Sequence, residues 1–290
     1  MNVQTSYEEK KTGTLYVVPT PIGNLEDMTF RAIKTLKEVD IIAAEDTRHT
    51  QKLLNHFEIK NKLISYHEHS KKERTEQLLD MLKQGENIAI VSDAGMPAIS
   101  DPGSELVKEV IAQEIQVVVL PGANAALCAL VGSGLSTDEF LFYGFLPRKK
   151  QEKEAELDRL GSLKATLIFY ESPYRIKDTL QVIVKQLGNR YISISREISK
   201  IYEQFLRGKA EDVLHWIEKN EIKGECCIVV EGNATEGAKD SVWWKGLSIP
   251  DHVKHYEVTD DMSHKAAMKQ VAVDRNISRR EVYQQIHVKK

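Results

Sequence analysis

The chain has 290 residues, of which 41% are hydrophobic and 29% charged, and this globular composition excludes a mostly disordered protein. Its formal net charge of −3 argues against a small, uniformly basic nucleic-acid-binding module. No apolar run approaches the ~20 residues of a membrane span. The first eleven residues lack the apolar core of a signal peptide. We therefore expect no membrane association.

The first half of the chain alternates strand and helix patterns. Short apolar runs predict five strands, at 15–18, 41–44, 63–66, 88–91 and 117–120. Apolar residues at helical spacing lie between them, and the unbroken Val/Ile/Leu character of the strands fits burial on both faces. We predict an α/β class protein whose N-terminal domain, 13–122, holds a five-stranded parallel sheet behind a flexible N-terminus, 1–12.

The second half has a different pattern. Strands are predicted at 140–143, 166–170, 192–195, 204–206 and 226–230. The third and fourth follow each other without a helix, which indicates an antiparallel pair and a mixed sheet in a C-terminal α/β domain, 123–234. A linker is predicted at 235–261, where periodic apolar positions are few. A basic helical tail follows at 262–290.

Three cysteines, Cys128, Cys226 and Cys227, form neither a CxxC motif nor a zinc-type cluster with histidine. An odd number of cysteines without a disulfide framework fits a reducing cytoplasm. We interpret them as small buried side chains and expect no metal site.

Three loops follow predicted strands of the first domain, at 18–24, 92–103 and 121–126. Each leaves the carboxyl end of a strand, where open α/β sheets bind ligands. Gly, Ala, Ser and Pro dominate these loops, so the backbone can approach a ligand closely. The alternative is that they are only tight connections.

These loops contain no Lys or Arg, and the glycine fingerprints of nucleotide phosphate sites are absent from the chain. The expected ligand is therefore neutral or cationic and free of phosphate. S-adenosylmethionine fits this description, because it combines an adenosine, an amino-acid tail and a positive sulfonium.

Seven strings in a fixed order then carry a family resemblance: GTLYVVPTPIGNLEDMTFRAI, AAEDTRHT, ISYHEH, SDAGMPAISDPG, PGANAA, FYESPYR and REISK. They resemble the ribosomal RNA small subunit methyltransferase I family, of the tetrapyrrole methylase superfamily, over about 13–232 and in the tail. Two positions depart from the expected pattern, Pro19 and Met96, and they affect local contacts only.

The resemblance implies a two-domain tetrapyrrole-methylase-like fold with the cofactor between the domains. It implies that the enzyme uses S-adenosylmethionine to methylate the 2′-oxygen of a cytidine ribose in the decoding region of 16S rRNA, within the small ribosomal subunit. A homodimer is implied as well. The cofactor-binding residues it implies are Pro21, Ile22, Asp93, Ala94, Gly95, Ile99, Ser100, Asn124, Ala125, Tyr170, Glu171, Val230, Glu231 and Gly232.

Methyl transfer to a hydroxyl needs alignment of the reacting atoms and benefits from a nearby base. The predicted catalytic residues are Asp93, His67 and His69, with Asp93 ranked first because it lies in a cofactor loop. Glu45, Asp46 and Glu171 are further candidates for the base. Each has a structural alternative, such as a helix cap for Asp46 and solvated loop positions for the histidines.

Basic residues near strand ends and in the tail predict the RNA-contacting face. They are Arg48, His49, Lys71, Lys72, Arg74, Arg148, Lys149, Lys150, Arg175, Arg279 and Arg280. The segment 262–290 carries a formal charge of +5 in a chain of −3, which suits contact with phosphates. Docking of the tail on the body or on a second subunit is the alternative.

Three other functions compete with RNA methylation. A tetrapyrrole methyltransferase of the same superfamily is the first alternative, and the basic tail argues against it. A non-enzymatic RNA-binding module does not explain three cofactor-type loops. A pyridine-nucleotide oxidoreductase lacks its phosphate fingerprint.

Overall fold

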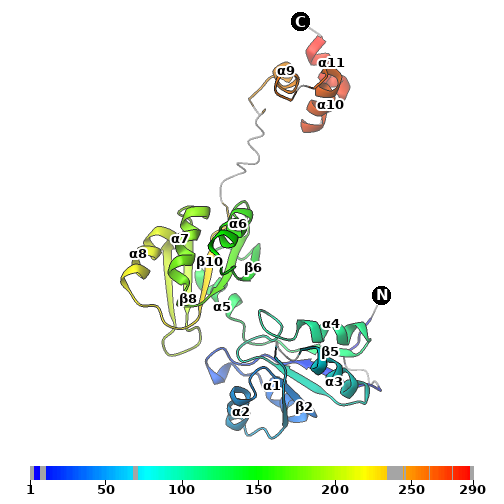
Figure 1. Cartoon of the computed structure of the whole chain (residues 1–290), viewed down its shortest axis with the longest axis vertical. Coiled ribbons are helices and arrows are strands. Elements are labelled where there is room, and N and C mark those ends of the chain that lie inside the picture. Colours follow the sequence, from blue (N-terminus) through cyan, green and yellow to red (C-terminus); the bar gives the residue numbers. More distant parts are fainter. Residues whose placement is uncertain are drawn as a thin grey trace. The chain divides into compact units, whose positions relative to one another are not determined.

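The computed structural model describes residues 3–6, 11–67, 71–233, 244, 246–260, 262–275 and 277–287. The chain divides into two compact units, Met1–Asn233 and Ala234–Lys290. The first contains two β-sheets with their helices, and the described part of the second is helical (Figure 1). Among the described residues, no helix has the length and apolar character needed to cross a bilayer.

The first sheet is parallel throughout, as predicted. In order across the sheet, its strands are β3 (Lys62–Ser65), β2 (Ile41–Ala44), β4 (Ile88–Val91), β1 (Thr14–Val17) and β5 (Gln116–Val119). Every residue of β2 and β4 is buried. This burial on both faces explains why these strands read as unbroken apolar runs rather than as alternating patterns.

Helices cover both faces of this sheet. The helical elements are η1 (Leu25–Asp27), α1 (Phe30–Glu38), α2 (Thr47–His56), α3 (Lys71–Lys83) and α4 (Ser104–Ala112). Ile42 packs in one core with Leu36 of α1 and Leu54 of α2. The next residue, Ala43, belongs to the opposite core, which α3 and α4 cover. Successive side chains of a strand point to opposite faces, so each strand serves two cores.

The second sheet is mixed, as predicted. In order across the sheet, its strands are β6 (Phe140–Phe145), β7 (Thr166–Glu171), β10 (Cys226–Val230), β8 (Tyr191–Arg196) and β9 (Gln204–Lys209). β6 and β7 are parallel, whereas β10 is antiparallel to both of its neighbours. The predicted antiparallel pair, β8 and β9, is confirmed.

Helices on the two faces of the second sheet differ in number. They are α5 (Ala125–Ser133), α6 (Lys150–Leu160), α7 (Ile176–Leu187) and α8 (Ala210–Lys219). Ala129 and Leu130 of α5 pack with Ile168 and Val229 of the sheet. The other three helices share a larger core with the opposite face, to which Phe169 belongs. The α5 helix directly follows the third predicted loop, so it connects the two sheets within one unit.

The second unit contains α9 (Ile249–Thr259), α10 (His264–Asp274) and α11 (Arg279–His287). The prediction of a linker over 235–261 is therefore wrong for 249–259. Val253 of α9 packs in one core with Val271 and Val282. The apolar pattern of α9 is sparse because a fully buried position holds His252, whose ring stacks on Trp244 and Tyr256.

The N-terminal segment predicted as flexible also makes a defined contact. The Gln4 side chain donates to the backbone carbonyl of Val117 at 2.8 Å and accepts from its N–H at 2.9 Å. These bonds satisfy backbone groups on the edge strand β5.

The separate core of the second unit predicts that the first unit folds without it. We expect the truncated chain 1–233 to show a cooperative melting transition at the same temperature as the first unit of the full chain. Differential scanning calorimetry measures this. Val271→Asp in the full chain, which places a charge in the core of the second unit, serves as the matched variant and should leave the same transition in place. A large loss of stability in both variants would contradict the division.

Candidate functional site

Two loops at the carboxyl edge of the parallel sheet are joined by backbone hydrogen bonds. Thr20 N–H donates to Gly95 O at 2.9 Å, and Gly95 N–H donates to Thr20 O at 3.0 Å. The Thr20 hydroxyl also donates to Ser92 O at 3.0 Å. The chain leaves β1 toward β2 and leaves the adjacent β4 toward β5, so these loops diverge at the point where α/β sheets bind ligands.

Gly95 is needed in this arrangement. Its φ of +79° is a conformation that L side chains rarely adopt, and a Cβ there would lie 3.2 Å from Ile22 Cγ2. A side chain at Gly95 would therefore strain the loop and crowd Ile22.

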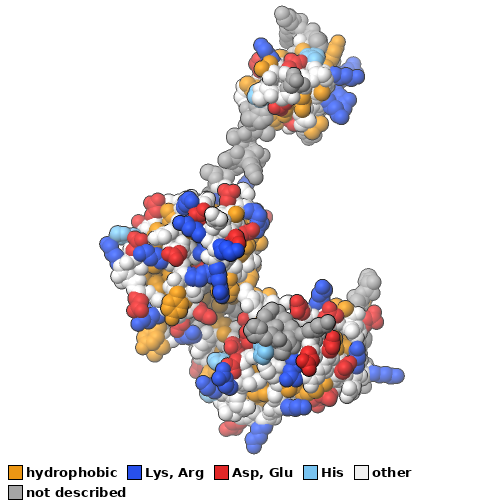
Figure 2. Space-filling view, viewed as in Figure 1, with side chains coloured by type: hydrophobic (Ala, Val, Ile, Leu, Met, Phe, Trp, Pro, Cys, Tyr) orange, Lys and Arg blue, Asp and Glu red, His pale blue; other side chains and the backbone are white. Residues whose placement is uncertain are grey.

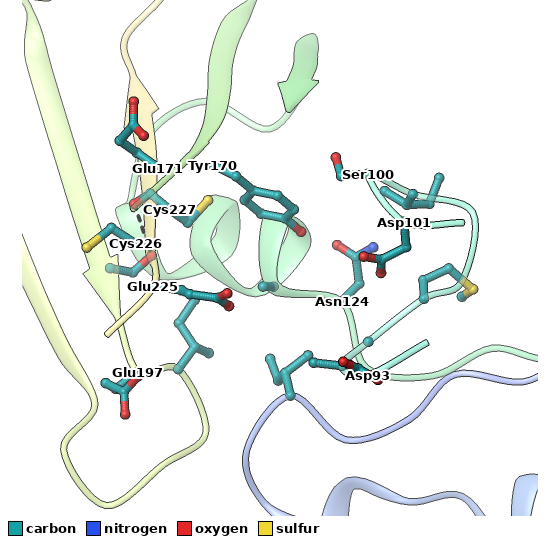
Figure 3. Close-up of a pocket in the computed structure, with 18 of the residues that line it drawn as sticks. Asp93, Ser100, Asp101, Asn124, Tyr170, Glu171, Glu197, Glu225, Cys226 and Cys227 are labelled. Atoms are coloured by element: carbon teal, nitrogen blue, oxygen red, sulfur yellow. Dashed lines mark hydrogen bonds between the residues drawn. The ribbon is translucent and has the colours of Figure 1, made fainter. Parts of the chain in front are cut away.

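A cavity of about 300 Å³ lies between these loops and the second sheet (Figure 3). Most of the predicted cofactor-binding residues line it. They are Ile22, Asp93, Ala94, Gly95, Ile99, Ser100, Asn124, Ala125, Tyr170 and Glu171. The structure thus brings together residues from all three predicted loops with the end of β7.

Four predicted cofactor residues do not line this cavity. Pro21 is adjacent to a lining residue, whereas Val230, Glu231 and Gly232 lie at the far end of β10. Because β10 is antiparallel to β7, Cys226 pairs with Glu171 and Val230 pairs with Leu167. The amino end of β10 therefore reaches the cavity, and its carboxyl end does not. Val230, Glu231 and Gly232 therefore lie away from the cavity that most of the other predicted residues line.

The amino end of β10 and the β8–β9 turn supply residues that the sequence did not indicate. Glu225, Cys226 and Cys227 line the cavity from β10. Ser195, Glu197, Ile198 and Lys200 line it from β8 and its turn. The Ser199 hydroxyl donates to Asp27, and Gly23 lies against Lys200, so this turn contacts the loop after β1. Three of these residues, Glu197, Ile198 and Lys200, belong to the family string REISK. The sequence marked this string as part of the family pattern but did not indicate that it lines the cavity.

Tyr170 links the second sheet to the start of α5. Its hydroxyl accepts a hydrogen bond from Ala126 N–H at 3.2 Å. Asn124 caps the same helix by accepting from Leu127 N–H at 3.1 Å. Burial raises the pKa of Tyr170 to about 12, so the phenol stays protonated at neutral pH. Its ring lies beside Phe142 and Phe145, and its hydroxyl points toward Asn124 (Figure 3).

The cavity has an acidic lining. Glu45, Asp93, Asp101, Glu171, Glu197 and Glu225 border it. Among the described lining residues Lys200 is the single basic side chain, and it pairs with Glu197 at 3.0 Å. Such a lining favours a neutral or cationic ligand, in agreement with the expectation from the loops. Within the described parts of the chain, no group of His, Cys, Asp and Glu side chains is placed to hold a metal ion.

Asp101 is the carboxylate whose proton affinity the cavity changes most clearly. Burial, followed by the negative charge of Glu45, raises the pKa of Asp101 to about 6. Asp93 and Glu225 contribute in the same direction, and a hydrogen bond with Ser92 opposes them. Asp101 and Glu225 reach into the cavity from opposite walls (Figure 3). Asp101 was not among the sequence candidates.

Asp93 has a partner in a neighbouring loop. Its Oδ1 accepts a hydrogen bond from Asp46 N–H at 3.1 Å. This bond ties the loop after β4 to the segment after β2, where Asp46 caps α2 through Arg48 N–H at 2.8 Å. Asp93 thus stabilises the cavity wall as well as lining it. Asp46 is a helix cap, which was the structural alternative for this residue.

His67, one of the two predicted histidines, does not line this cavity. His67 follows β3, the outer strand of the sheet, which β2 separates from β4. It is absent from the lining, and His69 lies outside the described residues. All five strands end at the carboxyl edge of the sheet, but the cavity lies at the central strands β4 and β1. The sequence did not show that β3 is an outer strand.

Glu171 borders the cavity but is held in a buried polar network. Its carboxylate lies 3.3 Å from Arg175 Nε and accepts from the Thr179 hydroxyl at 2.6 Å. Arg175 also donates to the carbonyls of Leu146 and Pro147, at 2.9 and 3.1 Å. Arg175, predicted as an RNA contact, is therefore largely committed to contacts within the chain.

Most of the other predicted RNA-contacting residues are exposed. Arg48 is exposed and pairs with Asp46 at 2.9 Å. Other exposed positions are His49, Arg148, Lys149, Lys150, Arg279 and Arg280, whereas Arg74 is half-buried. The side chains of Lys71 and Lys72 lie outside the described part.

Comparison with known proteins places these features in a family. The family model for Tetrapyrrole (Corrin/Porphyrin) Methylases matches residues 14–214. The chain is 55% identical over 288 residues to ribosomal RNA small subunit methyltransferase I of Halalkalibacterium halodurans, which covers 99% of both chains. The protein of that name from Bacillus subtilis is 51% identical, covering 99% of this chain and 98% of the relative.

A solved structure gives a likeness of fold. The uroporphyrin-III C-methyl transferase from Thermus thermophilus, complexed with S-adenyl homocysteine, matches with a TM-score of 0.54 and 19% identity. The match covers 76% of this chain and 97% of that one. This supports the predicted two-sheet architecture.

The raised pKa of Asp101 predicts a pH-dependent effect on stability. The folded state binds the Asp101 proton more tightly than the unfolded state, whose value is near 3.8, so ionisation of Asp101 opposes folding as the pH rises through about 6. At pH 7.5, Asp101→Asn should raise the melting temperature by about 2 °C, a small effect because solvent screens this half-buried group.

The gain should shrink as the pH falls toward 4, where the carboxyl is protonated in the folded state. Thermal unfolding at several pH values checks this, with exposed Asp158→Asn as the control. A gain that does not depend on pH would contradict the assigned electrostatic cause.

Proposed function

Because the chain belongs to the ribosomal RNA small subunit methyltransferase I family, we propose that it methylates 16S rRNA with S-adenosylmethionine as the methyl donor. The proposed acceptor is the 2′-hydroxyl of a cytidine ribose in the decoding region of the small ribosomal subunit. The observation that carries the proposal is the acidic, small-residue cavity at the sheet edge, in a chain about half identical to relatives of that name.

The cavity suits the cofactor chemically. S-adenosylmethionine supplies a methyl group on a positive sulfonium, and its amino-acid tail adds an ammonium group. The carboxylates of Asp93, Asp101 and Glu225 give the wall a negative field that favours both cations. Ala94, Gly95 and Ala125 carry little bulk, so a ligand can approach the backbone of these loops closely. The backbone hydrogen bonds between Thr20 and Gly95 hold the loops after β1 and β4 together.

Asp101 is proposed as the group that accepts the proton of the ribose hydroxyl. A general base works best when its pKa lies near the operating pH, and the value of about 6 for Asp101 meets this condition. Its carboxylate faces into the cavity (Figure 3). Asp93, the first candidate from the sequence, uses one oxygen to hold Asp46 N–H, which favours a positioning role. His67 is not assigned a catalytic role.

The second unit is proposed to add affinity for RNA. Arg279 and Arg280 are exposed at the start of α11, and the segment 262–290 carries a formal charge of +5, whereas the chain as a whole carries −3. A homodimer is part of the proposal through the family resemblance.

A tetrapyrrole methyltransferase is the alternative, since the fold is shared with a uroporphyrin-III C-methyl transferase. The two are separated by offering radiolabelled cofactor in parallel to 30S subunits, naked 16S rRNA and uroporphyrinogen. Digestion of the labelled RNA to nucleosides should yield a 2′-O-methylcytidine. Label in the porphyrinogen alone would overturn the proposal, and label on a base would overturn the 2′-oxygen assignment.

The proposed base predicts a difference between two isosteric variants. Asp101→Asn should lower turnover by at least ~100-fold and cofactor affinity much less, because it removes the proton acceptor while the carboxylates of Asp93 and Glu225 remain in the wall. The turnover of the wild-type enzyme should rise with a midpoint near pH 6, since the base must be ionised, and level off above it.

Asp93→Asn is the matched variant and should reduce turnover less. Single-turnover rates and calorimetric titration of the cofactor separate the two effects. If Asp101→Asn keeps near-normal turnover while Asp93→Asn loses turnover, the proposal is overturned and Asp93 is the base.

A further inference from the structure

A second hollow, separate from the cofactor cavity, lies along α6 and α7. Its volume is about 610 Å³, and five cations border it: Arg148, Lys150, Lys153, Arg175 and Lys185. Two carboxylates, Glu154 and Asp178, share the lining. Figure 2 shows Lys and Arg side chains over these two helices, interspersed with Asp and Glu. We call this hollow the α6–α7 groove. Its lining carries an excess of positive charge, opposite in sign to that of the cofactor cavity.

The partners of these cations show where the excess resides. Lys185 pairs with Glu154 at 2.9 Å, which neutralises one side of the groove. Arg148 and Lys150 form no hydrogen bond or ion pair with their side chains among the described residues, and both are exposed. They are the cations of the groove that remain available to a ligand.

The floor of the groove holds a buried and incompletely neutralised cation. Lys153 is 4% exposed, and its Nζ donates to the Thr179 hydroxyl at 2.7 Å. Thr179 in turn donates to Glu171, whose other oxygen faces Arg175 at 3.3 Å. The buried carboxylate of Glu171 therefore interacts with two cations, directly with Arg175 and through the Thr179 hydroxyl with Lys153. Burial lowers the pKa of Lys153, which reflects the cost of holding its charge there.

An anion in the groove would offset that cost. A phosphate group accepts several hydrogen bonds from Arg and Lys and carries the missing negative charge. The polar network also connects the groove to the cofactor cavity, because Glu171 borders the cavity and Arg175 borders the groove. The linings of the cavity and the groove therefore meet at the Glu171–Arg175 ion pair, within reach of one RNA strand.

We propose that the α6–α7 groove binds a backbone phosphate of the RNA strand next to the methylated nucleotide. This inference rests on the proposed function, since it assumes an RNA substrate at the cavity. Arg148 and Lys150 contact the phosphate at the rim, and Lys153 stabilises it from the floor. The groove then orients the strand, while the cavity performs the transfer.

The test compares two double variants of the full-length protein. Arg148→Gln with Lys150→Gln removes the two unpartnered rim cations. Lys37→Gln with Lys108→Gln removes two exposed cations from α1 and α4, and is the matched control. Affinity for 16S rRNA is measured at several salt concentrations, and the affinity for S-adenosylmethionine is measured in parallel.

The rim variant should bind RNA about tenfold more weakly and release about one fewer counterion in the salt dependence, with unchanged cofactor affinity. The control should match the wild type. Equal RNA affinity and salt slope in the two variants would overturn the proposal.

Inorganic phosphate provides a test that does not depend on methylation or on RNA. It should raise the melting temperature of the wild type and the control but not of the rim variant. Loss of this effect with unchanged RNA affinity would assign the groove to a small phosphorylated ligand and overturn the RNA assignment. If the wild type binds phosphate at the groove but neither binds nor methylates 16S rRNA, the proposed function fails and the RNA assignment fails with it.

Discussion

The arrangement of the site depends on the pair of backbone hydrogen bonds between Thr20 and Gly95. These bonds join the loops after β1 and β4 at the point where the chain connections diverge to opposite sides of the sheet. A backbone bridge of this kind needs a residue without a Cβ, because Gly95 adopts a positive φ and lies against Ile22. With the two loops held together, the carboxyl edge of the parallel sheet becomes one wall of a cavity rather than a set of independent turns.

The second wall comes from a sheet of different topology. Because β10 is antiparallel to β7, the amino end of one strand and the carboxyl end of the other meet at the same edge. Tyr170 then reaches the start of α5, and Glu225 faces the loops of the first sheet (Figure 3). The amino end of α5 is thus stabilised by its own Asn124 cap and by the hydroxyl of Tyr170 from the second sheet.

Charge is divided between the two faces of this wall. The cavity side carries carboxylates, which act together with burial to raise the pKa of Asp101, and the α6–α7 side carries cations. Glu171 lies between these two sets of charges. It borders the cavity, and its carboxylate interacts with Arg175 and Thr179. A cationic cofactor and an anionic polymer need opposite fields within a short distance. The buried network of Glu171, Arg175 and Thr179 fixes the position of side chains that border both sets of charges.

The sequence by itself determined the two sheets, the parallel direction of the first, the three small-residue loops and the family, because unbroken apolar runs, small-residue loops and motif strings are local features. Tertiary structure decided which strand end meets the cavity, since the antiparallel direction of β10 reverses the assignment of Val230–Gly232 in favour of Glu225–Cys227. It also moved the proposed base from Asp93 to Asp101, because proton affinity depends on burial and on carboxylates such as Glu45 that are distant in sequence. It removed His67 from the site, since only strand order places β3 at the margin. The helix α9 escaped prediction because His252 occupies a buried position where an apolar residue is the usual signal. In each case the missing information was a spatial neighbour, which no local pattern encodes.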